Sequence, residues 1–128
     1  MAIHQEVVFD TNTKTLYEIL TNSQQFTNFS GAPAEIGTSP GESFTAFGGM
    51  ITGQTIESLP GKRLVQAWRA GNWGDGVYSI VKFDLEPLND VQTKLVFDHT
   101  GYPETHKEHL EQGWHERYWA PIKNYIKE

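Results

Sequence analysis

Apolar positions in the first thirty residues change from a strand pattern to a helical pattern. Apolar and mostly β-branched residues occupy positions 3, 7, 8 and 9, which predicts an opening strand over residues 3–9. The following "DTNTK" supplies side chains that can cap a helix, and Leu16, Ile19 and Leu20 then fall on one helical face. A second short helix over residues 23–29 would bury Phe26 and Phe29. We therefore expect one strand followed by two short helices.

The middle of the chain alternates apolar and polar residues between frequent turn signals. We expect strands at residues 42–47, 50–59, 63–69, 76–86 and 91–100, separated by the turns "GG", "PGK", "GNWGDG" and "PLND". Such short links favour neighbouring strands in an antiparallel meander. Side chains alternate between the two faces of a strand, so the last two strands predict one inward-facing set. Its members are Val77, Ser79, Val81, Phe83, Leu85, Leu95, Phe97 and His99.

The C-terminal segment has the spacing of one long amphipathic helix. A helix over residues 103–127 would be roughly 36 Å long at ~1.5 Å per residue. Its apolar stripe consists of Leu110, Trp114, Tyr118, Pro121, Ile122 and Tyr125. Pro121 removes one backbone hydrogen bond and should bend the helix. The expected class is α+β, with this helix packed on one face of the sheet.

Composition and charge narrow the function classes. The 128 residues fit one domain, residues 1–128. A net charge of -6, with no basic cluster, argues against binding to nucleic acid or to an anionic membrane. No apolar run is long enough to span a bilayer, and the first ten residues lack a signal-peptide pattern, so we expect a cytoplasmic protein. The absence of cysteine excludes disulfides, zinc thiolate sites and thiol catalysis.

Three of the five histidines lie in the C-terminal segment and raise the question of a metal site. His106 and His109 are three residues apart and could share a metal ion, but His115 points elsewhere and the third ligand is missing. We interpret these histidines as helix-surface residues and expect neither a metal nor a cofactor. Gly113 in the middle of the helix indicates a close approach, either by a packed side chain such as Trp68 or by a ligand, and packing is the favoured interpretation.

Candidate catalytic groups are few. The chain has no Gly-x-Ser-x-Gly elbow, and His99 is the one plausible base that points inward. "GNWGDG" lacks the spacing of a phosphate loop and is interpreted as a hairpin turn. Trp73 within it is expected to be exposed and is therefore a candidate contact for a partner protein.

Two segments resemble a known family. "FGGMITGQTIESLPGKRLVQAWR" and "GYPETHKEHLEQGWHERYWAPIKNY" are similar to the most recognisable parts of the Hsp90 ATPase activator homologue 1-like domain. The resemblance extends over nearly the whole chain. It implies the helix-grip fold of the START/Bet v 1-like superfamily, in which a curved antiparallel sheet of six or seven strands wraps around a long C-terminal helix and often leaves a cavity. The family resemblance implies no catalytic residues.

Three functional hypotheses follow. The first is a non-enzymatic domain that encloses a small apolar or amphipathic molecule between the sheet and the C-terminal helix. Its candidate cavity residues are Phe44, Trp68, Val81, Phe83, Phe97, His99, Leu110, Trp114 and Tyr118. The second is a co-chaperone-like interaction module that binds or stimulates an Hsp90-type ATPase. The third is a cyclase or hydrolase that uses His99 in the same cavity.

Overall fold

The computed structural model describes residues 2–127, which leaves Met1 and Glu128 of the predicted domain outside the described residues. The first half contains β1 (Ala2–Phe9), α1 (Thr13–Thr21), α2 (Ser23–Ser30), β2 (Glu35–Ile36), β3 (Ser43–Ala46), a 3₁₀ turn (Phe47–Gly49) and β4 (Ile51–Leu59). Three further strands follow, β5 (Arg63–Ala70), β6 (Ser79–Asn89) and β7 (Gln92–Thr100). The C-terminal helix consists of a 3₁₀ turn (Glu104–His106), α3 (Lys107–Trp114), a π-helical turn (His115–Trp119) and α4 (Ala120–Lys127).

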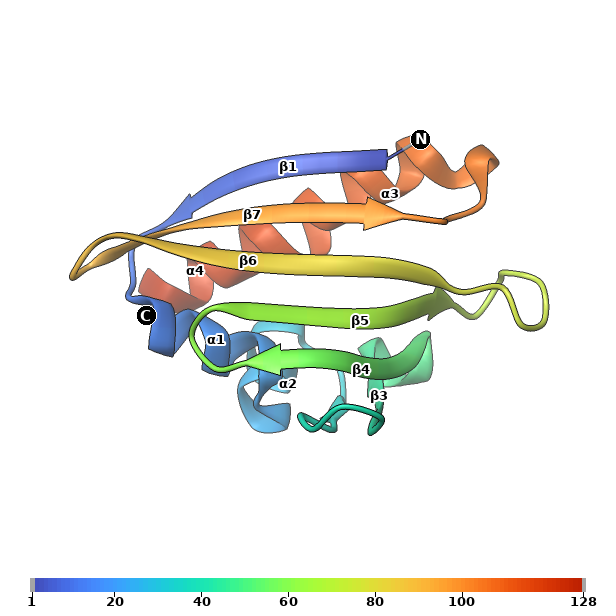
Figure 1. The fold of residues 1–128 in the computed structure, drawn as a ribbon, viewed down its shortest axis with the longest axis horizontal. Coiled ribbons are helices and arrows are strands. Elements are labelled where there is room, and N and C mark those ends of the chain that lie inside the picture. The colour runs from blue at the N-terminus through green and yellow to red at the C-terminus, as the bar shows by residue number, and fades with distance from the viewer. Residues whose placement is uncertain (1, 128) are drawn as a thin grey trace.

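All strands join one antiparallel sheet in the order β1-β7-β6-β5-β4-β3-β2. The helices lie behind the sheet in Figure 1, where α3 and α4 cross the strands diagonally and α1 and α2 close one end. The sheet follows the chain as a meander from β2 to β7, and β1 then pairs with the last strand. The predicted class, strand polarity and helix positions are confirmed, and the two-residue β2 brings the sheet to seven strands.

The predicted boundary of β6 is wrong at its start. Val77 was expected to face the core, but its side chain is exposed. Gly76 has a φ of 73°, and regular pairing begins only where Ser79 meets Trp68 of β5. Residues 71–78 therefore form a loop, and β6 begins only at Ser79.

A π-helical turn interrupts the C-terminal helix just before Pro121. Pro121 has no backbone N–H to donate to the carbonyl of Arg117, so the regular α-helical ladder is already broken there. In a π turn each residue advances through a smaller angle than in an α-helix, which brings residues five apart onto one face. Trp114 and Trp119 accordingly stack, with ring centroids 5.8 Å apart and an interplanar angle of 23°. The π turn buries Trp119, which the α-helical stripe omits.

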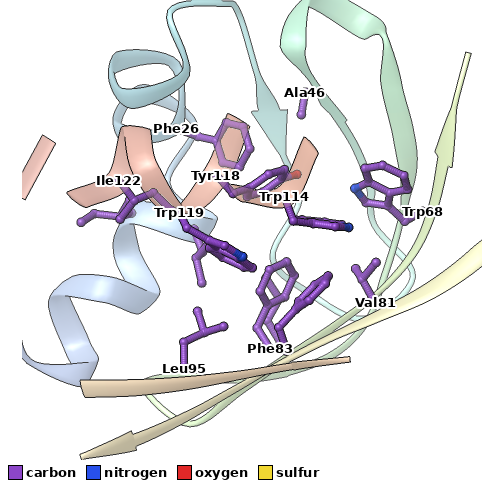
Figure 2. Close-up of a cluster of buried hydrophobic side chains, with 14 of the residues drawn as sticks. Phe26, Ala46, Trp68, Val81, Phe83, Leu95, Trp114, Tyr118, Trp119 and Ile122 are labelled. Atoms are coloured by element: carbon purple, nitrogen blue, oxygen red, sulfur yellow. The ribbon is translucent and has the colours of Figure 1, made fainter. Parts of the chain in front are cut away.

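The core is an aromatic layer between the sheet and the C-terminal helix (Figure 2). Trp114 is at its centre, with ring centroids 4.2 Å from Phe97 and 4.3 Å from Tyr118. The register places Phe83 directly opposite Phe97, so two adjacent strands present rings to the same helix. Burial of rings of this size dominates the stability of a small core.

The other face of the sheet is not covered by the helices and carries ion pairs beside exposed apolar side chains such as Val8 and Ile80. Arg63 pairs with Asp84 at 2.6 Å, and His4 pairs with Asp98 at 2.7 Å. Within residues 2–127, no helix is both long and apolar enough to cross a membrane.

Candidate functional site

A cavity of about 420 Å³ opens at one end of the sheet, between the strand termini and α3. Its sheet wall is made by the 3₁₀ turn, the start of β4 and the end of β5, with Phe47, Met50, Ile51, Trp68 and Ala70. Its loop wall is Gly71, Asn72 and Trp73. Volumes of this size are typical of small-molecule sites.

The helical wall comes from the C-terminal helix and supplies most of the polar groups. It consists of His106, His109, Leu110, Gly113, Trp114, Arg117 and Tyr118. Three- and four-residue spacing along the first turns places these side chains on one side of the helix, facing the end of β5.

Trp73 closes the cavity instead of pointing into solvent. The prediction that it is exposed is wrong, since only 6% of its surface is accessible. Arg69 causes the difference, because its guanidinium donates to the carbonyl of Trp73 at 2.8 Å and to that of Gly74 at 3.3 Å. These bonds fold the glycine-rich loop back, and the Trp73 ring packs 5.7 Å from that of Trp68.

The 3₁₀ turn supplies a residue that the sequence interpretation missed. Phe47 has a φ of 53°, and Gly48 and Gly49 follow with φ of 68° and 94°. A left-handed backbone is unfavourable for a bulky residue by about 1–2 kcal/mol. The centroid of the Phe47 ring lies 5.4 Å from that of Tyr118 and 5.6 Å from that of Phe26. The signal in the sequence is the glycine pair after an aromatic residue, which we interpreted as a turn and as part of the family resemblance.

Gly113 borders the cavity and is not packed. A Cβ atom at this position would have no atom of another residue within 4 Å, apart from the adjacent residues and its own helix backbone. The favoured interpretation, a close contact with a side chain such as Trp68, is therefore wrong. Gly113 instead leaves open space in the wall of the cavity.

His106 and His109 are helix-surface residues, as expected, and both also line the cavity. His106 is half-buried, with its ring 6.4 Å from that of Trp73, while His109 is exposed. Across residues 2–127, no group of three His, Cys, Asp or Glu side chains is arranged to hold a metal ion.

Two buried polar atoms distinguish the inner end of the cavity. Trp68 is 4% exposed, and its indole Nε1 has no hydrogen-bond partner among the described residues. Figure 2 shows this nitrogen on the edge of the ring that faces the Tyr118 hydroxyl. Burial raises the pKa of Tyr118, and the Trp68 N–H opposes that rise only in part. The Trp68 nitrogen has almost no accessible surface, so a molecule in the cavity does not reach it.

His99 is completely buried and fully hydrogen-bonded. Its Nδ1 accepts the indole N–H of Trp114 at 3.1 Å, so its proton is on Nε2, which donates to the Ser79 Oγ at 2.8 Å. Ser79 in turn donates to the carbonyl of Trp68 at 2.8 Å. Burial lowers the pKa of His99 from 6.5 to about 4. Because Nδ1 already accepts a bond and Nε2 carries the proton, this arrangement does not support the use of His99 as a base.

The predicted cavity residues separate into three groups. Four of them line the cavity, namely Trp68, Leu110, Trp114 and Tyr118. Phe44 and Phe83 border a separate space of about 10 Å³, which is nearly filled. Val81, Phe97 and His99 line neither space and belong to the packed interior, so their assignment to a cavity wall is wrong. The alternation of side chains along the strands correctly predicts which residues face inward. It does not predict at which point along the C-terminal helix the packed core ends and the cavity begins.

Comparison with known proteins places these features in a family. A profile described as "Activator of Hsp90 ATPase homolog 1-like protein" matches residues 10–127. The mouse protein named activator of 90 kDa heat shock protein ATPase homolog 2 is 29% identical over 99% of the chain, which covers 38% of the mouse protein. The human homolog 1 is 28% identical over 90% of the chain and 34% of its own length. The chain thus spans just over a third of these curated relatives.

Solved structures share the same architecture. An HSP90 activator from Plasmodium falciparum superimposes with a TM-score of 0.92 at 23% identity, covering 99% of this chain and 96% of that one. The Aha1 dimer from Colwellia psychrerythraea gives a TM-score of 0.78 at 19% identity, covering 94% and 92%. At these identities the likeness concerns the fold, which is the helix-grip fold.

Proposed function

Because this chain belongs to the Activator of Hsp90 ATPase homolog 1-like family, we propose that it is an interaction module that binds an Hsp90-type ATPase and changes its rate. The observation that carries the proposal is the similarity to the mouse activator, which extends over 99% of this chain. The relatives are longer proteins, so the proposal concerns what this one domain contributes.

Exposed apolar side chains at the cavity end of the sheet offer a contact surface. Met50 precedes β4 and is 61% exposed, while Tyr78, at the end of the β5–β6 loop, is 50% exposed. The guanidinium of Arg69 lies 5.7 Å from the centre of the Tyr78 ring and supports it. Exposed apolar groups of this kind are common at protein contacts. We assign the contact to Met50 and Tyr78 in place of the buried Trp73.

An ATPase assay with the cognate Hsp90-type protein tests this function. The wild-type domain should bind the chaperone and change its turnover rate, and a Met50→Ser, Tyr78→Ser double variant should weaken both effects. A matched control replaces Leu88 and Val91 by Ser, because these residues are also exposed but lie at the β6–β7 hairpin, the opposite end of the sheet in Figure 1. Wild-type protein that neither binds nor alters the ATPase would exclude the function.

A second candidate function rests on the cavity itself. We propose that its aromatic walls enclose a small apolar or amphipathic molecule, with the open volume of about 420 Å³ as the supporting observation. Native mass spectrometry of protein purified from its own host should show a retained mass that disappears on denaturation. A clean mass of the unliganded chain would oppose enclosure and leave the interaction module as the function. The predicted cytoplasmic location is part of both proposals, and cell fractionation checks it.

A further inference from the structure

The charges around the cavity differ in sign from the charge of the whole chain. The chain carries 16 acidic and 10 basic residues, yet none of the residues lining the cavity is Asp or Glu. The wall includes the guanidinium of Arg117 and the imidazoles of His106 and His109, which donate hydrogen bonds in either protonation state. Arg117 makes no ion pair with the side chains of residues 2–127. The lining therefore favours an anion over a cation.

Arg117 is the charged group at the mouth of the cavity, where its side chain is exposed on the solvent side. The indole N–H of Trp68 lies deeper and faces the Tyr118 hydroxyl (Figure 2), with almost no accessible surface. A ligand in the cavity therefore finds its polar anchor at the mouth.

The remaining wall of the cavity is mostly apolar. Phe47, Trp73 and Trp114 provide ring surfaces, and the missing side chain at Gly113 leaves room along α3. Aromatic walls gain energy from offset or edge contacts with another ring. A volume of about 420 Å³ accommodates a two-ring compound or a medium-length alkyl chain.

We propose that the cavity binds an apolar carboxylate, with the carboxylate beside Arg117 at the mouth and the apolar body against the aromatic walls. This inference rests on the second proposed function, the enclosure of a small molecule. Hydrogen bonds between an arginine and a carboxylate are among the stronger ones in proteins. Charge complementarity at Arg117 selects the carboxylate end of the ligand, and the aromatic walls select its apolar end.

Isothermal titration calorimetry with matched probes tests the two ends separately. The reference probe is 2-naphthoate; 2-naphthamide lacks the charge, and decanoate replaces the rings by an alkyl chain. We expect the amide to bind about tenfold more weakly than the acid, the size of one charge-assisted hydrogen bond. Decanoate that binds as tightly as the naphthoate would indicate an aliphatic acid, and much weaker binding would indicate an aromatic one.

Variants of the chain assign each effect to a residue. Arg117→Gln should bring the acid to the affinity of the amide, whereas Lys127→Gln, on the same helix but outside the cavity, should change nothing. Gly113→Leu should fill the cavity and abolish binding of every probe, while Gln112→Leu adds the same side chain at an exposed position and should bind normally. Circular dichroism verifies that each variant is folded. If Gly113→Leu does not fold, Gly113→Ala replaces it, with a smaller expected loss of binding affinity.

The outcomes distinguish the proposal of a carboxylate ligand from the broader proposal that the cavity encloses a small molecule. Equal binding of acid and amide, lost in Gly113→Leu, would overturn the carboxylate and retain an enclosed neutral molecule. Failure of every probe to bind the folded wild-type protein would overturn the carboxylate proposal and count against enclosure as well. Binding that persists in Gly113→Leu would place the ligand elsewhere and also refute the assignment.

Discussion

Trp114 donates its indole N–H to the Nδ1 of His99 at 3.1 Å, and this bond joins the C-terminal helix to β7 inside the aromatic core. It requires an unprotonated Nδ1, and burial favours the neutral imidazole for the same reason that it disfavours any buried charge. Protonation of the His99 Nδ1 would therefore break this contact between the C-terminal helix and the sheet.

Stability should fall in acid because of His99. Its pKa is about 4 in the folded chain against 6.5 for the exposed side chain, so the unfolded chain binds the proton first as pH falls. The contribution of His99 is present above pH 6.5 and decreases toward pH 4, by about 3 kcal/mol. Urea unfolding from pH 7 to pH 4 measures it, with His99→Gln as the control that cannot titrate. Parallel pH profiles for the two proteins would contradict the prediction.

The indole N–H groups of Trp114 and Trp68 should contribute differently to the free energy of unfolding. Trp114→Phe leaves the Nδ1 of His99 without a donor, whereas Trp68→Phe removes an N–H that has no partner among residues 2–127. Both changes delete the same atoms. We therefore expect Trp114→Phe to lower the free energy of unfolding by about 1–3 kcal/mol more than Trp68→Phe. Chemical denaturation of both variants decides this, and equal losses would show that the bond contributes nothing net.

Two glycines should respond to alanine with opposite signs. Gly113 lies in α3, where a Cβ would meet open space, so Gly113→Ala should stabilise the helix by up to about 1 kcal/mol. Gly53 lies in β4, where a Cβ would be 1.8 Å from the carbonyl oxygen of Ala67 and 2.7 Å from the Phe44 ring. Gly53→Ala should therefore destabilise the sheet. Thermal unfolding gives both signs, and a destabilised Gly113→Ala would mean that the cavity wall is tighter than the structure indicates.

The sequence predicts the architecture well because its elements are periodic. A period of two residues predicts the strands that carry Phe83, Phe97 and His99. A period of 3.6 residues predicts the helix that buries Trp114. The burial of Trp119 does not follow, because the π turn puts residues five apart on one face and leaves no pattern of its own in the sequence.

The cavity is harder to predict because its walls depend on single contacts distant from any periodic segment. "GNWGDG" has the composition of an exposed turn, but the guanidinium of Arg69 and the ring contact between Trp73 and Trp68 hold it inward. Gly113 is equally compatible with a tight contact and with open space, since the residue itself specifies only the absence of a side chain. The sequence therefore identifies inward residues, while the surface at which packing ends requires the assembled structure.

The loop that carries Trp73 should loosen when Arg69 is replaced. Arg69 donates to two loop carbonyls from one guanidinium nitrogen, and a lysine ammonium lacks the planar fork that suits this arrangement. We expect Arg69→Lys to lower the free energy of unfolding by about 1 kcal/mol and to speed hydrogen exchange in residues 71–78. Arg63→Lys is the control, because Arg63 is in the same strand but pairs with Asp84 on the outer face. Exchange in residues 71–78 that is equally slow in both variants would show that Trp73 is held by its ring contacts alone.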